Sequence, residues 1–320
     1  KRSRDKSTLK EIIKSSKINN NLVNDPVSFI EENLPKNLEG GVKSNNPYML
    51  KNIIPVPSML HLAVNAAASI YVQNGVTGED AATALDSELK VASVISEMAG
   101  YNKHAAGGLF TFGGTATNMY AFKIGLTKAI PDHTSNGINE RVCIVGSKPA
   151  HYSHVSAVTW LGIGQDNYIH AKSHIDQSTD LKDLKDKCRQ VLKNGSKLAC
   201  IVGAVGTTSN MGIDDFFEIY KIRNDLVQEF SLDYIPHVHA DSVVGWVYLY
   251  FKDYDFSNNE LGFSLDVLDR LKQSVEKIST LEHADSFGVD FHKTGYMPYV
   301  TSMVICRDNK DLSLLDRNTE

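Results

Sequence analysis

From about residue 107 onward, short β-branched runs alternate with amphipathic helical patterns, and this alternation constrains the fold more than any other feature. Ile219, Ile222 and Leu226 recur at helical spacing behind Asp214 or Asp215, either of which can cap a helix. Five runs have the composition of buried strands: residues 142–146, 168–171, 198–205, 234–240 and 303–306. Strands and helices in this order predict an α/β fold, a three-layer α/β/α sandwich with a mainly parallel central sheet.

The chain before residue 101 differs in composition and pattern from the rest. Residues 1–50 are polar and predict a loosely held arm with one or two helices, such as residues 25–33. Apolar residues at helical spacing then predict helices over residues 58–75 and 78–98. We therefore divide the chain into an N-terminal arm and helical segment, residues 1–100, and a large domain, residues 101–320.

Composition excludes several classes of protein. The chain has 320 residues with 42% hydrophobic and 22% charged residues, which is ordinary globular usage. No apolar run approaches the roughly 18 residues of a membrane span, and a net charge of -5 argues against a nucleic-acid partner. The four cysteines are far apart without a CxxC pair, so we expect neither a zinc ribbon nor a disulfide framework. A reducing compartment, the cytoplasm, is the predicted location.

Four short segments carry residues suited to chemistry. In the first, residues 107–118, glycines and threonines precede a helical pattern and can direct backbone N–H groups and hydroxyls at a phosphate. The segment lacks a P-loop lysine and GxGxxG spacing. A plain strand-to-helix turn is the alternative.

The second segment follows a predicted strand and contains His151 and His154. His151 can stack on an aromatic ligand or transfer a proton, or it is simply a loop histidine. The two histidines also permit a metal site at i, i+3, but no nearby carboxylate completes a ligand set.

The third segment ends in Asp241, at the carboxyl edge where open α/β sheets bind their ligands. A carboxylate there needs a cationic partner, such as a protonated ring nitrogen, unless it caps the next element. In a regular strand His237, His239 and Asp241 share one face, which leaves a metal site as a third possibility.

The fourth segment places Lys293 after an apolar strand-like stretch and before Thr294 and Gly295. Most lysines are solvated, but a buried lysine loses its proton readily and becomes an amine nucleophile for carbonyls. A phosphate loop, a stacking histidine, a buried aspartate and such a lysine are together the parts that a pyridoxal phosphate site requires.

These segments resemble those of the group II pyridoxal-phosphate-dependent amino acid decarboxylases, which have the aspartate-aminotransferase type of fold. The similarity covers the phosphate loop at residues 110–121, the histidine segment at 151–164, the Gly-Thr-Thr segment at 206–215, His239-Ala-Asp241, and the lysine motif at 285–293. It extends from about residue 45 to the end.

The resemblance implies a role for each matching residue and no metal. Lys293 should hold the cofactor covalently, Asp241 should pair with the pyridine nitrogen, and His151 should stack on the ring. Further cofactor contacts are implied for Gly114, Thr115, Thr207, Thr208 and His292. The chain departs from the family in Ser242, where alanine is usual, and in Asp290, where asparagine is usual and where a carboxylate sits awkwardly beside a phosphate.

The resemblance also implies the function. We expect a lyase that decarboxylates an L-amino acid to an amine and carbon dioxide, with a preference for glutamate or aspartate, as a homodimer with shared active sites. Another pyridoxal phosphate enzyme on the same fold, or an inactive subunit, is the alternative. Because the sequence starts at Lys1 rather than Met, we expect a longer gene product. We also expect Glu320 to mark the edge of a mobile or cleaved loop, with a C-terminal domain beyond it.

Overall fold

The structure is a computed structural model, which describes residues 6–15, 25–39, 46, 53–71, 83–148 and 150–315. Its internal contacts divide the chain into two units, Lys1–Lys43 and Ser44–Glu320. The first unit contains α1 (Lys6–Ser15) and α2 (Pro26–Leu38). Asp25 begins α2, since its carboxylate accepts hydrogen bonds from the backbone N–H groups of Val27 and Ser28. The helix predicted from residue 25 is therefore confirmed, and it continues to Leu38.

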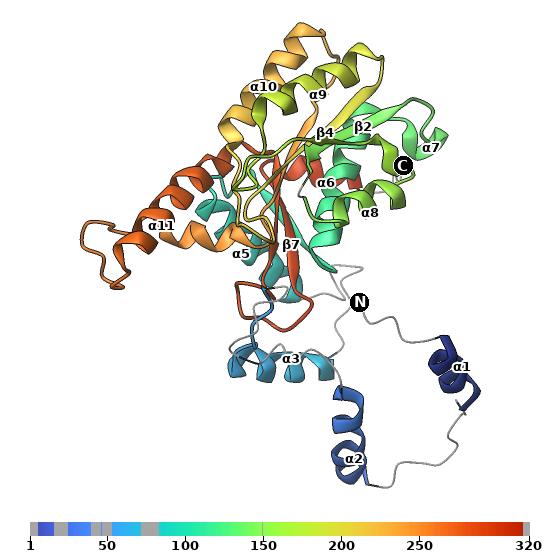
Figure 1. Ribbon diagram of the computed structural model, residues 1–320, viewed down its shortest axis with the longest axis vertical. Coiled ribbons are helices and arrows are strands. Elements are labelled where there is room, and N and C mark those ends of the chain that lie inside the picture. The colour runs from blue at the N-terminus through green and yellow to red at the C-terminus, as the bar shows by residue number, and fades with distance from the viewer. Residues whose placement is uncertain are drawn as a thin grey trace. The chain divides into compact units, whose positions relative to one another are not determined.

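The second unit contains the sheet and the helices that surround it (Figure 1). Its strands are β1 (Gly107–Thr111), β2 (Val142–Ser147), β3 (Tyr168–Ala171), β4 (Lys197–Ala204), β5 (His237–Asp241), β6 (Ser286–Asp290) and β7 (Ser302–Cys306). Its α-helices are α3 (Met59–Tyr71), α5 (Thr83–Met98), α6 (Gly114–Ala129), α7 (His133–Asn136), α8 (Ser153–Trp160), α9 (Leu181–Lys193), α10 (Phe216–Glu229) and α11 (Leu265–Ile278). Shorter 3₁₀ helices are η2 (Gln165–Asn167), η3 (Gly245–Phe251), η4 (Ser279–His283) and η5 (Asn309–Leu315).

The described strands form one sheet in the order β1-β7-β6-β5-β4-β2-β3. Strands β6, β5, β4, β2 and β3 run parallel, and β7 pairs antiparallel with both β6 and β1. The carboxyl ends of the parallel strands therefore meet at one edge of the sheet. Ser302, the first residue of β7, lies at this same edge because it pairs with Asp290, the last residue of β6.

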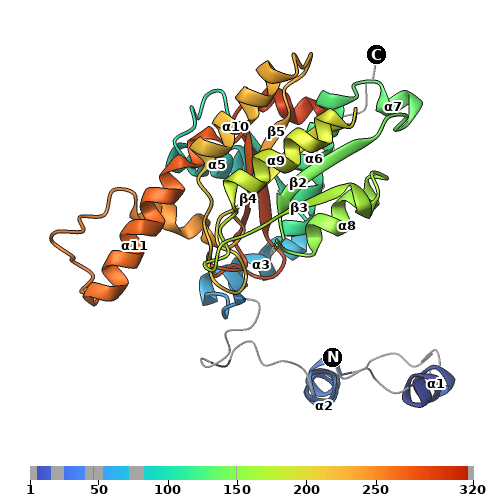
Figure 2. The ribbon, with the colours of Figure 1, turned by 45° about the horizontal axis from the view of Figure 1, so that its top comes forward.

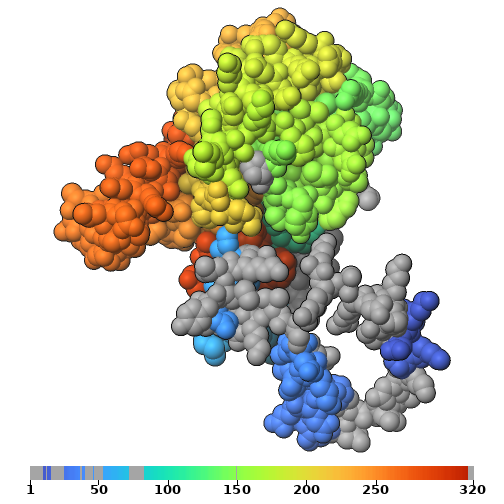
Figure 3. Space-filling model, viewed as in Figure 1, coloured from blue at the N-terminus to red at the C-terminus, as the bar shows by residue number. Residues whose placement is uncertain are grey.

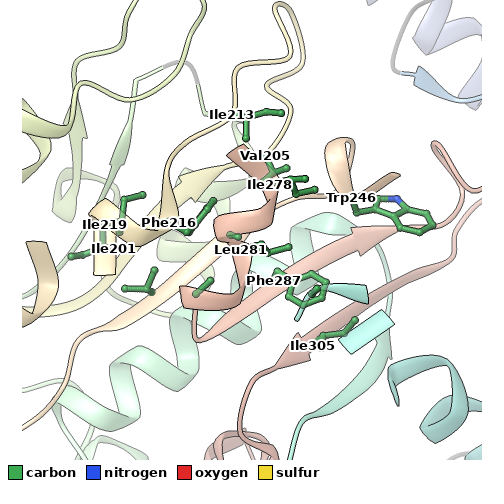
Figure 4. Packing of buried hydrophobic residues seen from close by; sticks show 14 of the residues in the cluster. Ile201, Val205, Ile213, Phe216, Ile219, Trp246, Ile278, Leu281, Phe287 and Ile305 are labelled. Carbon is green, nitrogen blue, oxygen red and sulfur yellow. The ribbon is translucent and has the colours of Figure 1, made fainter. Parts of the chain in front are cut away.

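Helices cover both faces of the sheet, which confirms the predicted three-layer α/β/α class (Figure 2). On one face α5, α9 and α10 pack over a core that includes Ile201, Phe216, Phe287 and Ile305 (Figure 4). On the other face α6 and α8 pack over a second core, in which Phe122 of α6 meets side chains of β2 and β4. Helix α11 and the loop before it project from the unit (Figure 3).

The predicted strands are confirmed with one shift. Strand β5 starts at His237, three residues later than expected. Pro236 has no N–H group to donate to a neighbouring strand, so the pairing begins after it. Tyr234 instead lies in the preceding loop, and its hydroxyl accepts a hydrogen bond from the backbone N–H of Leu198 at 2.8 Å. Strand β1 is not among the predicted strands, because residues 107–118 are interpreted from the sequence as a phosphate-binding segment or a plain strand-to-helix turn.

The N-terminal and C-terminal predictions are tested only in part. Helices α3 and α5 confirm the two helices expected before residue 101, while residues 72–75 and 78–82 of those predictions lie outside the described residues. The polar stretch 308–311 leads into η5, where Asp311 Oδ2 lies 2.7 Å from Lys128 Nζ of α6. This ion pair ties the stretch to the helix layer of the sheet. The predicted loop edge at Glu320 lies outside the described residues, and no described helix is long and apolar enough to cross a membrane.

Candidate active site

A cavity of about 240 Å³ opens at the carboxyl edge of the parallel strands. The structure brings all the site residues predicted from the sequence into its lining, although they come from five separate segments. These residues are Gly114, Thr115, His151, Thr207, Thr208, Asp241, His292 and Lys293. Asn118, Ser153, His154 and Asp290 also line the cavity.

Asp241 ends β5 at the floor of the cavity, with only 8% of its surface exposed. Its Oδ2 atom accepts hydrogen bonds from His154 Nε2 at 2.8 Å and from Asn118 Nδ2 at 3.2 Å. Its Oδ1 atom is buried and has no hydrogen-bond partner among the described residues. A buried carboxylate oxygen without a partner is costly, so this atom is free to accept a hydrogen bond from an N–H or O–H group of a bound molecule.

Electrostatics keep Asp241 ionised. Burial alone raises the pKa of this carboxyl, but the hydrogen bond from His154 and the charges of His154 and Lys293 outweigh it. The resulting pKa lies well below the usual range for aspartate. The free Oδ1 atom therefore presents a negative charge, which suits a protonated ring nitrogen.

His154 reaches Asp241 from the first turn of α8 and is itself oriented by Tyr168 on β3. Its Nδ1 atom lies 2.8 Å from the hydroxyl of Tyr168, and both side chains are buried. Burial, the largest effect, raises the pKa of Tyr168 well above its ordinary value, so the hydroxyl keeps its proton. With Nδ1 beside this hydroxyl, the ring is oriented so that its Nε2–H group donates to Asp241.

Sequence reasoning missed this role of His154. The His151/His154 spacing was considered only for a metal, and the carboxylate that contacts His154 belongs to β5, far along the chain. In the described residues no group of three histidine, cysteine or acidic side chains is placed to hold a metal ion. The histidines of β5 have other partners, because His237 Nε2 and His239 Nδ1 lie 2.7 and 2.8 Å from Ser286 Oγ.

His151 lies just before α8 and stays exposed at the cavity. Its Nδ1 atom accepts a hydrogen bond from the backbone N–H of Ser153 at 3.2 Å, so the proton of the neutral ring is on Nε2. Partial burial lowers its pKa, and the nearby charge of Lys293 acts in the same direction. A neutral imidazole of this kind can lie against an aromatic ring.

The turn before α6 needs its glycines. Gly113 has a φ of 115°, which side-chain-bearing residues rarely adopt. A Cβ on Gly114 would lie 2.9 Å from Val243 Cγ1 and 3.1 Å from Asp290 Oδ2. The backbone at the N-terminus of α6 therefore lies directly beside the cavity with Thr115, as a phosphate-binding turn requires.

The loop after β4 carries Thr207 and Thr208. Thr207 is buried, and its Oγ1 atom accepts a hydrogen bond from the backbone N–H of Gly212 at 2.9 Å. Thr207 thus holds the loop closed, whereas Thr208 is exposed. The Gly-Thr-Thr segment has a structural role in addition to the cofactor contact that the sequence predicts.

Lys293 follows β6, and its Nζ atom lies 2.9 Å from Asp290 Oδ2. Asp290 is 2% exposed and also accepts a hydrogen bond from Ser302 Oγ at 2.5 Å. The amine, the free oxygen of Asp241 and the α6 turn all lie in one cavity. This set of residues fits pyridoxal phosphate: an unpaired carboxylate for its ring nitrogen, a lysine for its aldehyde and a helix N-terminus for its phosphate.

Comparison with known proteins agrees with this geometry. A family model described as "Pyridoxal-dependent decarboxylase conserved domain" matches residues 12–245. The chain belongs to this family. The cofactor expected from the sequence, pyridoxal phosphate, is the one for which the family is named. Lys293 lies beyond the matched residues, so its role rests on its own surroundings in the cavity.

Relatives in this decarboxylase family differ in substrate. The chain is 29% identical over 231 residues to an aspartate 1-decarboxylase of Aliivibrio fischeri, covering 67% of this chain and 36% of that protein. It is 26% identical over 228 residues to an L-2,4-diaminobutyrate decarboxylase of Rhizobium meliloti, covering 71% and 39%. The chain thus spans little more than a third of the length of these relatives.

Solved structures have the same fold. The glutamate decarboxylase domain of a Vibrio parahaemolyticus diaminobutyrate-pyruvate transaminase and L-2,4-diaminobutyrate decarboxylase matches with a TM-score of 0.74 at 21% identity. The match covers 97% of this chain and 63% of that chain. At this identity the likeness supports the fold class alone.

Proposed function

We propose that the protein decarboxylates an L-amino acid to the corresponding amine and carbon dioxide, with pyridoxal phosphate as its cofactor. The observation that carries this proposal is the free Oδ1 atom of Asp241, buried in the same cavity as the amine of Lys293. When bound, the cofactor supplies an electron sink for the pair of electrons that the departing carboxylate leaves behind. Membership of the decarboxylase family supports the reaction type.

Each of the site residues has its own role in the proposed reaction. Asp241, held ionised by His154, keeps a proton on the ring nitrogen. Lys293 supplies the amine for covalent attachment, and His151 covers one face of the ring. Gly114, Thr115 and His292 contact the phosphate, with Thr207 or Thr208 near the ring substituents. The closed cavity floor excludes water from the Asp241 carboxylate, which strengthens its interaction with a cation.

For the substrate we propose an acidic amino acid, glutamate or aspartate. The aspartate decarboxylase among the relatives supports this preference, while the diaminobutyrate decarboxylase shows that the family also accepts basic substrates. Among the described residues that line the cavity, Lys293 is the sole lysine or arginine. The cation that binds the side-chain carboxylate therefore comes from outside this lining.

We also propose that two copies form a dimer that completes each site, and that the protein is cytoplasmic. Helix α3 supports the dimer, because Met59, Leu60, Ile70 and Tyr71 are 70–80% exposed and form an apolar surface suited to a second copy. The four cysteines are free thiols, which supports a reducing compartment.

The proposal is tested with the complete protein and a panel of L-amino acids, by measuring released carbon dioxide. We expect release with glutamate or aspartate, and borohydride should fix the cofactor on the peptide that contains Lys293. Asp241→Asn should keep the cofactor and lose turnover by orders of magnitude, whereas Asp214→Asn, a buried acid outside the cavity, should not. Another product, labelling of a different lysine, or normal turnover in Asp241→Asn would contradict the assignment.

A further inference from the structure

The carboxylate of Asp290 lies beside Gly114, the first residue of α6, where the turn would hold an anion. Its two oxygens are 3.1 and 3.2 Å from the position that a Cβ on Gly114 would take, so both face the first residue of α6. A helix N-terminus attracts negative charge, because its first N–H groups have no partner within the helix and its dipole is positive there. Asp290 therefore already supplies a negative charge at the site predicted for the cofactor's phosphate.

Three side chains hold this carboxylate in place. Ser302 Oγ donates a hydrogen bond to Oδ1 at 2.5 Å, and Lys293 Nζ lies 2.9 Å from Oδ2. His292 Nε2 lies 3.7 Å from the same Oδ2 atom. Since Asp290 is 2% exposed, its charge depends on these partners rather than on water. The arrangement satisfies Asp290 within the chain itself.

A bound cofactor would destabilise the Asp290 carboxylate in two ways. Its phosphate would bring a second anion to the N-terminus of α6, where repulsion is strong because the surroundings are buried. Its aldehyde would engage the Lys293 amine, which is the nearest cation to Asp290. Ser302 and His292 would remain, but a neutral hydroxyl and a ring nitrogen at 3.7 Å compensate a buried charge poorly.

Building on the proposed function, we infer that Asp290 is an internal competitor of the cofactor's phosphate. It occupies the anion-binding end of the cavity in the cofactor-free protein and lowers the affinity for pyridoxal phosphate, specifically through the phosphate group. The preference for pyridoxal phosphate over pyridoxal, measured as the ratio of their Kd values, is therefore smaller than it would be with a neutral residue at position 290.

The test compares Asp290→Asn with the wild type. Cofactor-free protein is titrated with pyridoxal phosphate and, separately, with pyridoxal, and binding is followed by absorbance and equilibrium dialysis. Asparagine keeps the size of the side chain and removes its charge. Because loss of the Lys293 partner affects both ligands, the ratio of the two Kd values isolates the phosphate. We expect Asp290→Asn to increase the preference for pyridoxal phosphate by about tenfold or more.

Asp214→Asn is the matched control, because Asp214 is equally buried, accepts hydrogen bonds from Thr179 and from the backbone N–H of Ala204, and does not itself line this cavity. It should leave the ratio unchanged. If Asp290→Asn does not fold, Asp290→Ser is titrated instead, with the same expected increase. An unchanged or reduced preference in the Asp290 variant, or an equal increase in the control, would overturn the inference. If the wild type binds no pyridoxal phosphate, the proposed function itself fails, which is a separate outcome.

Discussion

The hydrogen bond from His154 to Asp241 should contribute strongly to folding, and replacing His154 with leucine tests this. The bond is 2.8 Å long, and its two side chains are 2% and 8% exposed. Leucine fills part of the space but donates no hydrogen bond. The carboxylate would then keep only the Asn118 amide, at 3.2 Å.

The magnitude follows from the burial of the pair. Removing one partner of a buried, hydrogen-bonded charge pair costs about 3–5 kcal/mol. Since Asn118 still donates to the same oxygen, we expect the lower end, a loss of about 3 kcal/mol in the free energy of unfolding. At pH 7 this is on the order of a hundredfold in the folding equilibrium.

The assay is urea unfolding of cofactor-free protein. The control is His170→Leu, because His170 is an exposed residue of β3. A double-mutant cycle with Asp241→Asn then tests the cause. An asparagine carries no charge, so His154→Leu should cost much less in that background. An equal cost in both backgrounds would refute the argument, since the loss would then come from packing rather than from the unpaired carboxylate.

Three further predictions concern the rest of the second unit. Burial lowers the pKa of His239 to about 3, so this histidine binds a proton far more weakly in the folded protein than in the unfolded chain. Its neutral form therefore contributes fully to the free energy of unfolding above about pH 6.5, and that free energy falls by about 2 kcal/mol at pH 5. His239→Gln should make the free energy of unfolding depend less on pH in an acid-unfolding experiment. Arg223→Met should lower the free energy of unfolding by about 2 kcal/mol, because the buried carboxylate of Asp285 loses the guanidinium at 2.7 Å and keeps only Arg307 and the backbone N–H of Val238. A midpoint in urea within error of the wild type would contradict this. Gly114→Ala should weaken pyridoxal phosphate binding without unfolding the protein, since its methyl group meets Val243 and Asp290; unchanged affinity in a dialysis experiment would show that the turn does not approach the ligand.

Much of the fold and of the site could be predicted from local sequence. Strand β3 has the predicted bounds, and β2, β4 and β7 differ from theirs by one residue at one or both ends, because a fully buried strand is a continuous apolar run between turns. The eight predicted site residues share one cavity for a related reason. Residues that follow parallel strands, such as His151, Asp241 and Lys293, meet at the same edge of a sheet whatever the length of chain between them.

The tertiary structure alone decided which partners these residues have. His154 contacts Asp241 because α8 packs against α6 and β3, and Ser302 reaches Asp290 because β7 runs antiparallel to β6. Neither contact leaves a pattern along the chain, since hydrogen bonds between distant side chains depend on strand order and helix position rather than on spacing. The sequence therefore determined the fold class and the types of residue that lie at the carboxyl edge of the sheet. Only the packed structure decided that His154 supports a carboxylate rather than a metal ion, and that Asp290 lies at the N-terminus of α6.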